Sequence, residues 1–62
     1  MAEKHKTYWG EVEHQGKVIG VFRMIKGQRW VGQHEDGYIT SPVVEPSIAA
    51  DDVIHYHVFL KG

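Results

Sequence analysis

The chain has 62 residues and is expected to form one domain, 1–62, near the lower size limit for a stable hydrophobic core. Seven Lys and Arg residues against eight Asp and Glu give a formal charge of −1, which excludes an overall attraction to nucleic acid or anionic lipid. The absence of cysteine excludes disulfides, thiol catalysis and thiolate zinc sites, and favours a cytoplasmic location. No apolar run long enough to serve as a signal peptide or to cross a bilayer is present, so no membrane association is expected.

The first two-thirds of the chain has the pattern of an antiparallel meander. Glycine-containing turn signals recur about every ten residues between runs rich in Val, Ile, Tyr, Trp and Phe. These signals are Gln15-Gly16, Gly27-Gln28 and Asp36-Gly37. They predict strands at 7–14, 17–26, 29–35 and 38–44, and residues 1–6 are expected to be frayed.

The second predicted strand is apolar on both faces, which indicates that both sides of the sheet need cover. Strict alternation puts Val18, Phe22 and Met24 on one face, and Ile19, Val21 and Ile25 on the other. Strong bending at Gly20 in a barrel, or a second subunit behind an open sheet, would provide that cover.

The last third contains a helical signal and then a further apolar run. Pro46, Ser47 and the alanines that follow predict one helical turn within 45–52, and the last strand is expected at 53–61. The expected fold is therefore all-β: a five-stranded antiparallel sheet, a meander with one helical turn before the last strand. This is the element order of a small Src-homology-type barrel, and a strongly curved open sheet is the alternative.

Read as a strand, residues 53–60 carry a different chemistry on each face. One face would hold Ile54, Tyr56, Val58 and Leu60, and the other Val53, His55, His57 and Phe59. Two imidazoles on one strand face could share a transition metal if His34, His14 or the pair Asp51-Asp52 supplied a third ligand, although histidines at this spacing more often only pack and hydrogen-bond. A pH-sensing role is a further alternative because imidazole titrates near neutrality.

No arrangement typical of an enzyme is found, and no cofactor is expected. The hydroxyls of Thr40, Ser41 and Ser47 lie in turn or cap contexts, and no glycine-rich phosphate loop is present. The carboxylates of Glu11 and Glu13 share a strand face, which is typical of a solvated surface.

Aromatic and basic residues are the better candidates for function, because Trp and Arg dominate binding energies at interfaces. The sequence favours a non-catalytic binding or regulatory module for a protein partner or a second copy of itself, of the kind found among bacterial, phage or mobile-element accessory proteins. The expected partner-binding residues are Trp9, Arg23, Arg29, Trp30, His55, His57 and Phe59. Two alternatives remain open: nucleic-acid binding through Arg23, Lys26, Arg29 and Trp30, and transition-metal binding through His55 and His57.

Overall fold

The computed structural model describes residues 8–61, so the expectation that residues 1–6 are frayed lies outside the described part. Three antiparallel strands form an open sheet in the order β1-β2-β3. The strands are followed by helix α1, which continues as a single π-helical turn, η1. The element bounds are β1 Trp9–His14, β2 Lys17–Ile25, β3 Arg29–His34, α1 Pro46–His55 and η1 Tyr56–Leu60.

The meander of the first three strands lies within two residues of its expected bounds. Gln15 and Gly16 both have positive φ, as the two-residue hairpin turn between β1 and β2 requires. Gly27 and Gln28 have positive φ in the turn between β2 and β3. These two turns fix the register, which pairs Trp9 with Arg23 and Arg23 with Val31 across the sheet.

A β-bulge in β2 decides which apolar side chains reach the core. Val12 pairs with Gly20 and Glu13 with Val18, so Ile19 is the extra residue in the ladder. Ile19 turns to the helix side, where it is fully buried against Val12 and Val53. Strict alternation, which grouped Val18 with Phe22 and Ile19 with Val21, is therefore wrong at this point.

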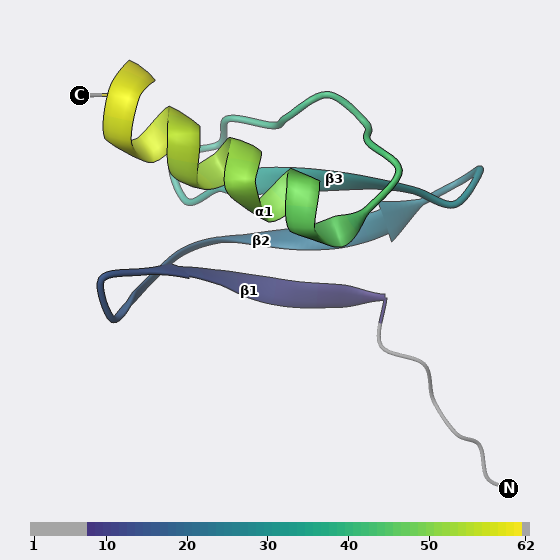
Figure 1. Ribbon diagram of the computed structural model, residues 1–62, viewed down its shortest axis with the longest axis horizontal. Helices are drawn as coiled ribbons and strands as arrows, with labels where there is room; N and C mark the ends of the chain where they lie inside the picture. The colour runs from purple at the N-terminus through teal and green to yellow at the C-terminus, as the bar shows by residue number, and fades with distance from the viewer. Residues whose placement is uncertain (1–7, 62) are drawn as a thin grey trace, which may run out of the picture.

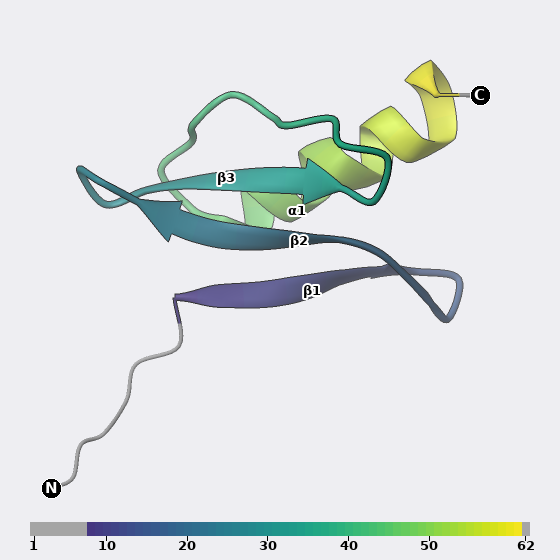
Figure 2. The same cartoon turned by 180° about the vertical axis from the view of Figure 1, so that it is seen from behind.

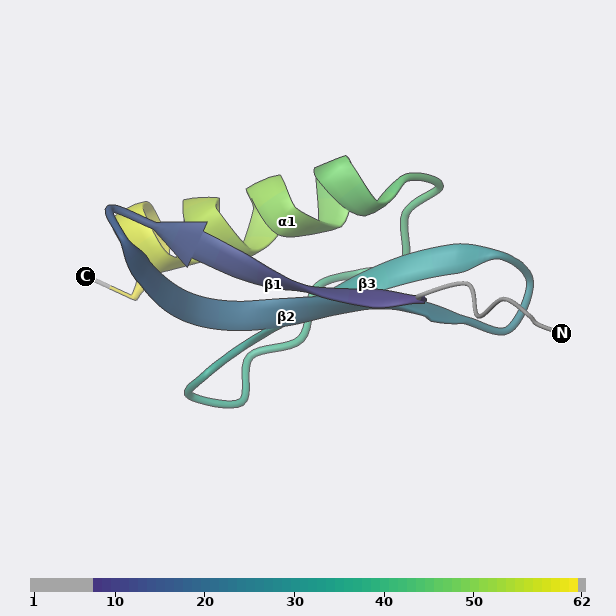
Figure 3. The ribbon, with the colours of Figure 1, turned by 90° about the horizontal axis from the view of Figure 1, so that it is seen from below.

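Helix α1 covers one face of the sheet only. Figure 1 shows α1 in front of β2 and β3, and Figure 3 shows the helix on one side of the sheet with no helix on the other. The side chain of Val53 and the backbone of Ala49 lie against Gly32 of β3, where an added Cβ would meet them at 2.4 and 2.7 Å. The small core of this layer consists of Val12, Ile19 and Val53, with Phe22, Ala50 and Ile54 packed around it.

The predicted five-stranded sheet, and the barrel with it, is wrong. No continuous strand forms at 38–44: this segment meets β3 only through the isolated bridges Gln33 to Ile39 and Trp30 to Val43. Thr40 donates its amide to the Gly32 carbonyl, and its hydroxyl accepts the Gly32 amide, so the segment still satisfies the outer edge of β3. The sheet therefore ends here and does not close.

The strand expected at 53–61 is also wrong, because these residues continue the helix. Pro46 stands in the first turn, where its missing amide hydrogen costs no helical bond. Ala49, Val53 and His57 then recur every four residues on the side that meets the sheet, which is helical spacing. The apolar alternation within 53–60 fits a strand equally well by itself, and packing against the sheet decides for the helix.

Candidate functional site

The face of the sheet away from α1 is covered by no helix in the described part of the chain, although the loop after β3 lies on this side in Figure 3 and Val31 is buried. Figure 2 looks onto this side, with the strands in front and α1 behind them. We call it the open face. By pairing and alternation its residues are Trp9, Glu11, Glu13, Val18, Val21, Arg23, Ile25, Arg29, Val31, Gln33 and Glu35.

One cross-strand row near the basic end of the open face combines an exposed aromatic residue with a fixed cation. Trp9, Arg23 and Val31 are direct neighbours across the three strands. Trp9 is 58% exposed, whereas Val31 is buried. Arg23 Nη1 donates a hydrogen bond of 3.1 Å to Gln33 Oε1, which holds the guanidinium group along the sheet. The row therefore presents a positioned charge beside a large apolar ring.

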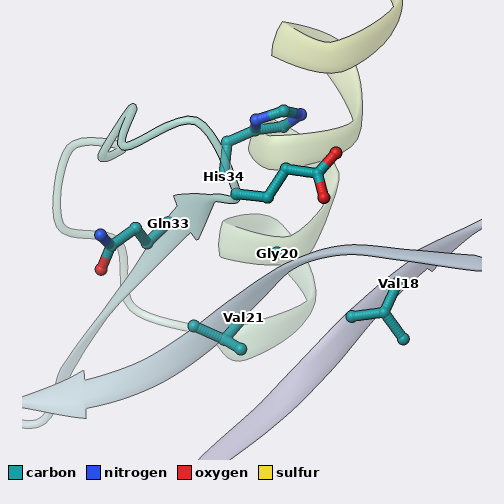
Figure 4. A pocket seen from close by; sticks show the side chains of 6 residues that line it. Val18, Gly20, Val21, Gln33 and His34 are labelled. Carbon is teal, nitrogen blue, oxygen red and sulfur yellow. The ribbon is translucent and has the colours of Figure 1, made fainter.

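An open pocket of about 340 Å³ lies toward the other end of the same face. Its lining is Val18, Gly20, Val21, Gln33, His34 and Glu35. In Figure 4 the side chains of Val18, Val21 and Gln33 point to the near side of the strands, away from the helix behind them, whereas His34 points toward the helix. The pocket thus has apolar walls, with an amide and a carboxylate at its rim, and this chemistry suits an aliphatic side chain that ends in a cation.

Charge is divided between the two ends of the open face. Arg23, Lys26 and Arg29 lie around the turn that joins β2 to β3. Glu13 and Glu35 lie at the opposite end, where Lys17 Nζ is 3.5 Å from Glu35 Oε2 and both side chains are largely exposed. The face is therefore basic at one end and acidic at the other.

A second cluster lies on the helix side, at the end of the sheet next to η1. His34, at the end of β3, is 1% exposed, and its Nε2 is 2.9 Å from His57 Nδ1. The His57 ring also meets the His14 ring edge-on at a centroid distance of 5.7 Å. These three imidazoles join the first hairpin, the end of β3 and the helical end of the chain.

The buried His34 ring is held on both of its nitrogens. Its Nδ1 is 3.1 Å from the Asp36 amide, which donates to it, and 3.2 Å from Asp36 Oδ1, which can accept a proton from it, while its Nε2 shares one hydrogen bond with His57 Nδ1 whose direction depends on the tautomer. Partial desolvation lowers the pKa of His57 below its ordinary value, and the neighbouring His34 and His14 lower it further.

Asp36 and two tyrosines form the outer part of the same cluster. The Tyr56 hydroxyl donates to Asp36 Oδ2 at 2.8 Å, and the Tyr38 amide donates to Asp36 Oδ1 at 3.0 Å. These bonds, the Tyr38 amide first, lower the pKa of Asp36, and the bond to Asp36 raises the pKa of Tyr56. The rings of Tyr38 and Tyr56 stack at a centroid distance of 3.9 Å. The cluster therefore fastens the loop after β3 to the helical end of the chain.

The seven residues expected to bind a partner do not form one surface. Trp9, Arg23 and Arg29 share the open face, and both Trp9 and Arg29 are exposed there. Trp30 is half-buried on the helix side, with its ring centroid 5.8 Å from that of Phe22.

The remaining three predicted contacts lie on the helical end of the chain. His55 and His57 do not share a face, because successive helical residues turn by about 100°. The exposed His55 ring packs against Phe59 at a centroid distance of 4.9 Å, while His57 turns to His34. Among residues 8–61, no three His, Asp or Glu side chains are placed to hold a metal ion, so the geometry gives the metal alternative no support.

Sequence patterns missed two features of these sites. Gln33 was not singled out, because only the cross-strand pairing reveals that it holds Arg23. The link of Tyr56 to Asp36 joins residues 20 positions apart and has no local signal. His34 and His14 were named as companions of His57, and the structure does bring all three together, but as a hydrogen-bonded and packed group.

Two searches complete the description of the chain. None of the described helices has the length and apolar character needed to cross a membrane. Comparison of the chain with protein-family models, with curated proteins and with solved structures gives no significant match.

Proposed function

We propose that this protein is a non-catalytic binding module that engages a protein partner with the open face of its sheet. The observation that carries the proposal is the cross-strand row of that face in which the exposed Trp9 lies beside Arg23, itself held by Gln33. Trp and Arg supply most of the energy in protein interfaces. A side chain that is already held in place loses little entropy on binding, which favours affinity. The lack of cysteine supports the cytoplasm as its compartment.

The mixed charge of the open face favours a protein partner over nucleic acid. Arg23 and Arg29 would attract phosphates, but Glu11 and Glu13 stand on the same face and would repel them. A protein surface can offer both signs of charge in a fixed arrangement, and this arrangement determines specificity and orientation.

Single-stranded nucleic acid is a second candidate because the basic end of the face gathers Arg23, Lys26 and Arg29 near the exposed Trp9. Trp30 has no part in this version, since it packs on the helix side. Binding of a labelled oligonucleotide should then weaken steeply with salt, and Arg29→Ala should reduce the salt slope. A flat salt response would end this candidate.

The experiment for the main proposal compares capture of protein partners by the wild type and by two variants. Trp9→Ser removes the exposed ring of the open face, and Phe59→Ser is the matched control, because Phe59 is 70% exposed but lies on the helical end. We expect a partner, whether another protein or a second copy, to be retained by the control variant and lost from Trp9→Ser. A partner retained by Trp9→Ser and lost from Phe59→Ser would overturn the proposal, as would a wild type that binds no protein.

A further inference from the structure

The open-face side chains of β3 and the residue after it form a stripe that is complementary to itself. In chain order they are the exposed Arg29, the buried Val31, the half-buried Gln33 and the exposed Glu35. Glu35 belongs to the stripe because its amide donates to the Ile19 carbonyl, which continues the ladder, and its side chain lines the pocket. Reversed against a second copy, the stripe sets the basic residue opposite the acidic one at both ends.

We infer that the open face binds a second copy of this chain, face to face with the strands antiparallel, so that Arg29 of each protomer meets Glu35 of the other. This inference rests on the proposed function and names its partner. The two-fold axis lies between the sheets, perpendicular to the strands, and therefore places β3 over β3 while exchanging the two ends of each strand. Sheets packed in aligned sandwiches adopt this kind of face-to-face contact.

Charge selects this orientation over the other face-to-face arrangement. An axis parallel to the strands and over β2 would leave the strand ends in place but put β1 over β3, so that Arg23 would lie over its own copy and Glu13 near Glu35. Like charges held opposite each other destabilise a contact, whereas opposite charges set the register. The antiparallel arrangement is the one that brings the basic end over the acidic end.

The pocket provides a place for the incoming arginine. It is walled by Val18 and Val21, with Gln33 and Glu35 at the rim, and it lies at the acidic end of the face. An arginine can lay its methylenes on the valines while its guanidinium group meets the Glu35 carboxylate. In the same arrangement Ile25 of one protomer lies over Val18 of the other, which adds an apolar contact beside each charged pair.

The edge of the sheet is a poorer place for a second copy. β3 is covered along its outer edge by the segment that bridges Trp30 and Gln33. β1 is the free edge, and it carries Glu11 and Glu13, both exposed. Charged side chains on an edge strand discourage the addition of another strand, so the face is the better surface.

The size of the face sets the expected affinity. Three strands of about six residues cover roughly 20 Å by 14 Å, at about 3.3 Å per residue and about 4.8 Å between strands. Such an area, roughly 280 Å² on each protomer, is smaller than that of standard interfaces and is typical of a weak, transient contact. We therefore expect reversible association with a dissociation constant on the order of 10 to 100 µM, so that the dimer forms only in concentrated samples.

Charge reversal tests the inference by sedimentation equilibrium over this concentration range. Arg29→Glu alone, or Glu35→Arg alone, puts like charges together at both symmetric positions, and each should weaken self-association about tenfold or more. The double variant Arg29→Glu with Glu35→Arg should restore it, and so should an equal mixture of the two single variants, because a heterodimer has two attractive pairs again. Asp51→Arg, at an exposed position of α1 on the other side of the sheet, is the control and should change association less than threefold.

The outcomes separate this inference from the proposed function. If the wild type stays monomeric at about 1 mM, the inference that a second copy binds the open face is wrong. If such a monomer still binds another protein and Trp9→Ser abolishes that binding, the open face remains the binding surface. Self-association that the single reversals leave unchanged overturns the antiparallel contact. Equal melting temperatures of the variants under dilute conditions would exclude misfolding as the reason for any loss.

Discussion

Helix α1 lies so close to the sheet at Gly32 that a methyl group there is predicted to destabilise the protein strongly. A Cβ added at Gly32 would lie 2.4 Å from a methyl carbon of Val53 and 2.7 Å from the Ala49 carbonyl oxygen, both inside van der Waals contact. The carbonyl belongs to the backbone of α1, so the helix itself must move to admit the new group. Overpacking of this kind costs roughly 1–3 kcal/mol.

The free-energy cost of this clash is partly offset by the gain from replacing glycine with alanine in a strand. Replacing glycine within a strand recovers roughly 0.5–1 kcal/mol of backbone entropy. With a clash against backbone near the upper end of its range, Gly32→Ala should cost about 2 kcal/mol net. For a domain of this size, that is a large part of a total stability of roughly 3–9 kcal/mol, and it lowers the melting temperature by roughly 8–16 °C.

Thermal unfolding followed by circular dichroism measures the effect, with Gly10→Ala as the matched control. A Cβ at Gly10 faces the same side of the sheet but meets only the far end of the Phe22 ring, at 2.4 Å, which can rotate away. Gly10→Ala should therefore cost less than about 1 kcal/mol. An unfolding temperature for Gly32→Ala equal to or above that of Gly10→Ala would refute the packing of α1 on β3.

Three further predictions concern the core and the histidine cluster. Val53→Ala, which empties part of a fully buried position, should lower the free energy of unfolding in urea by roughly 2 kcal/mol, and a loss below about 0.5 kcal/mol would contradict the core placement. Because the folded pKa of His57 is lowered, its contribution to stability is complete above its ordinary value of 6.5 and is lost as the pH falls through the folded pKa. His57→Gln should thus flatten the decline of the melting temperature below pH 6.5, whereas His55→Gln should leave it as in the wild type. Asp36→Asn should lower the pKa of Tyr56 toward its ordinary 10.0 in a phenolate absorbance titration, and an unchanged curve would disprove the bond between them.

The first three strands could be predicted from the sequence because local chemistry determines them. Gly16 and Gly27 mark turns with positive φ, and the β-rich runs between them leave few alternatives. The bulge at Ile19 could not be predicted in this way, since alternation assumes an unbroken ladder. The position of Trp9 on the face opposite Val12 follows from strict alternation, because β1 contains no such irregularity before Val12.

The last third could not be assigned from local pattern, because its pattern fits both periods. Residues 53–60 alternate as a strand would, yet Ala49 and Val53 together have the spacing of a helix. A search for apolar residues four positions apart that began before Asp51 and Asp52 would have paired Ala49 with Val53 and so favoured the helix. The predicted strand face that carried both imidazoles is therefore wrong as well, since His55 and His57 point in different directions on a helix. The open face, in contrast, depends on strand pairing, which the turns already indicated.

The central claim is that the open face, with the exposed Trp9 on its edge strand, is where this protein makes contact. Trp30→Phe leaves Trp9 as the sole tryptophan, and Trp9→Phe leaves Trp30, which is half-buried on the helix side. Acrylamide quenching of each variant, alone and in the bound or concentrated state, reports which ring loses contact with water. The account predicts that Trp9 becomes protected on binding while quenching of Trp30 stays constant. Protection of Trp30 with Trp9 still fully quenched would contradict it.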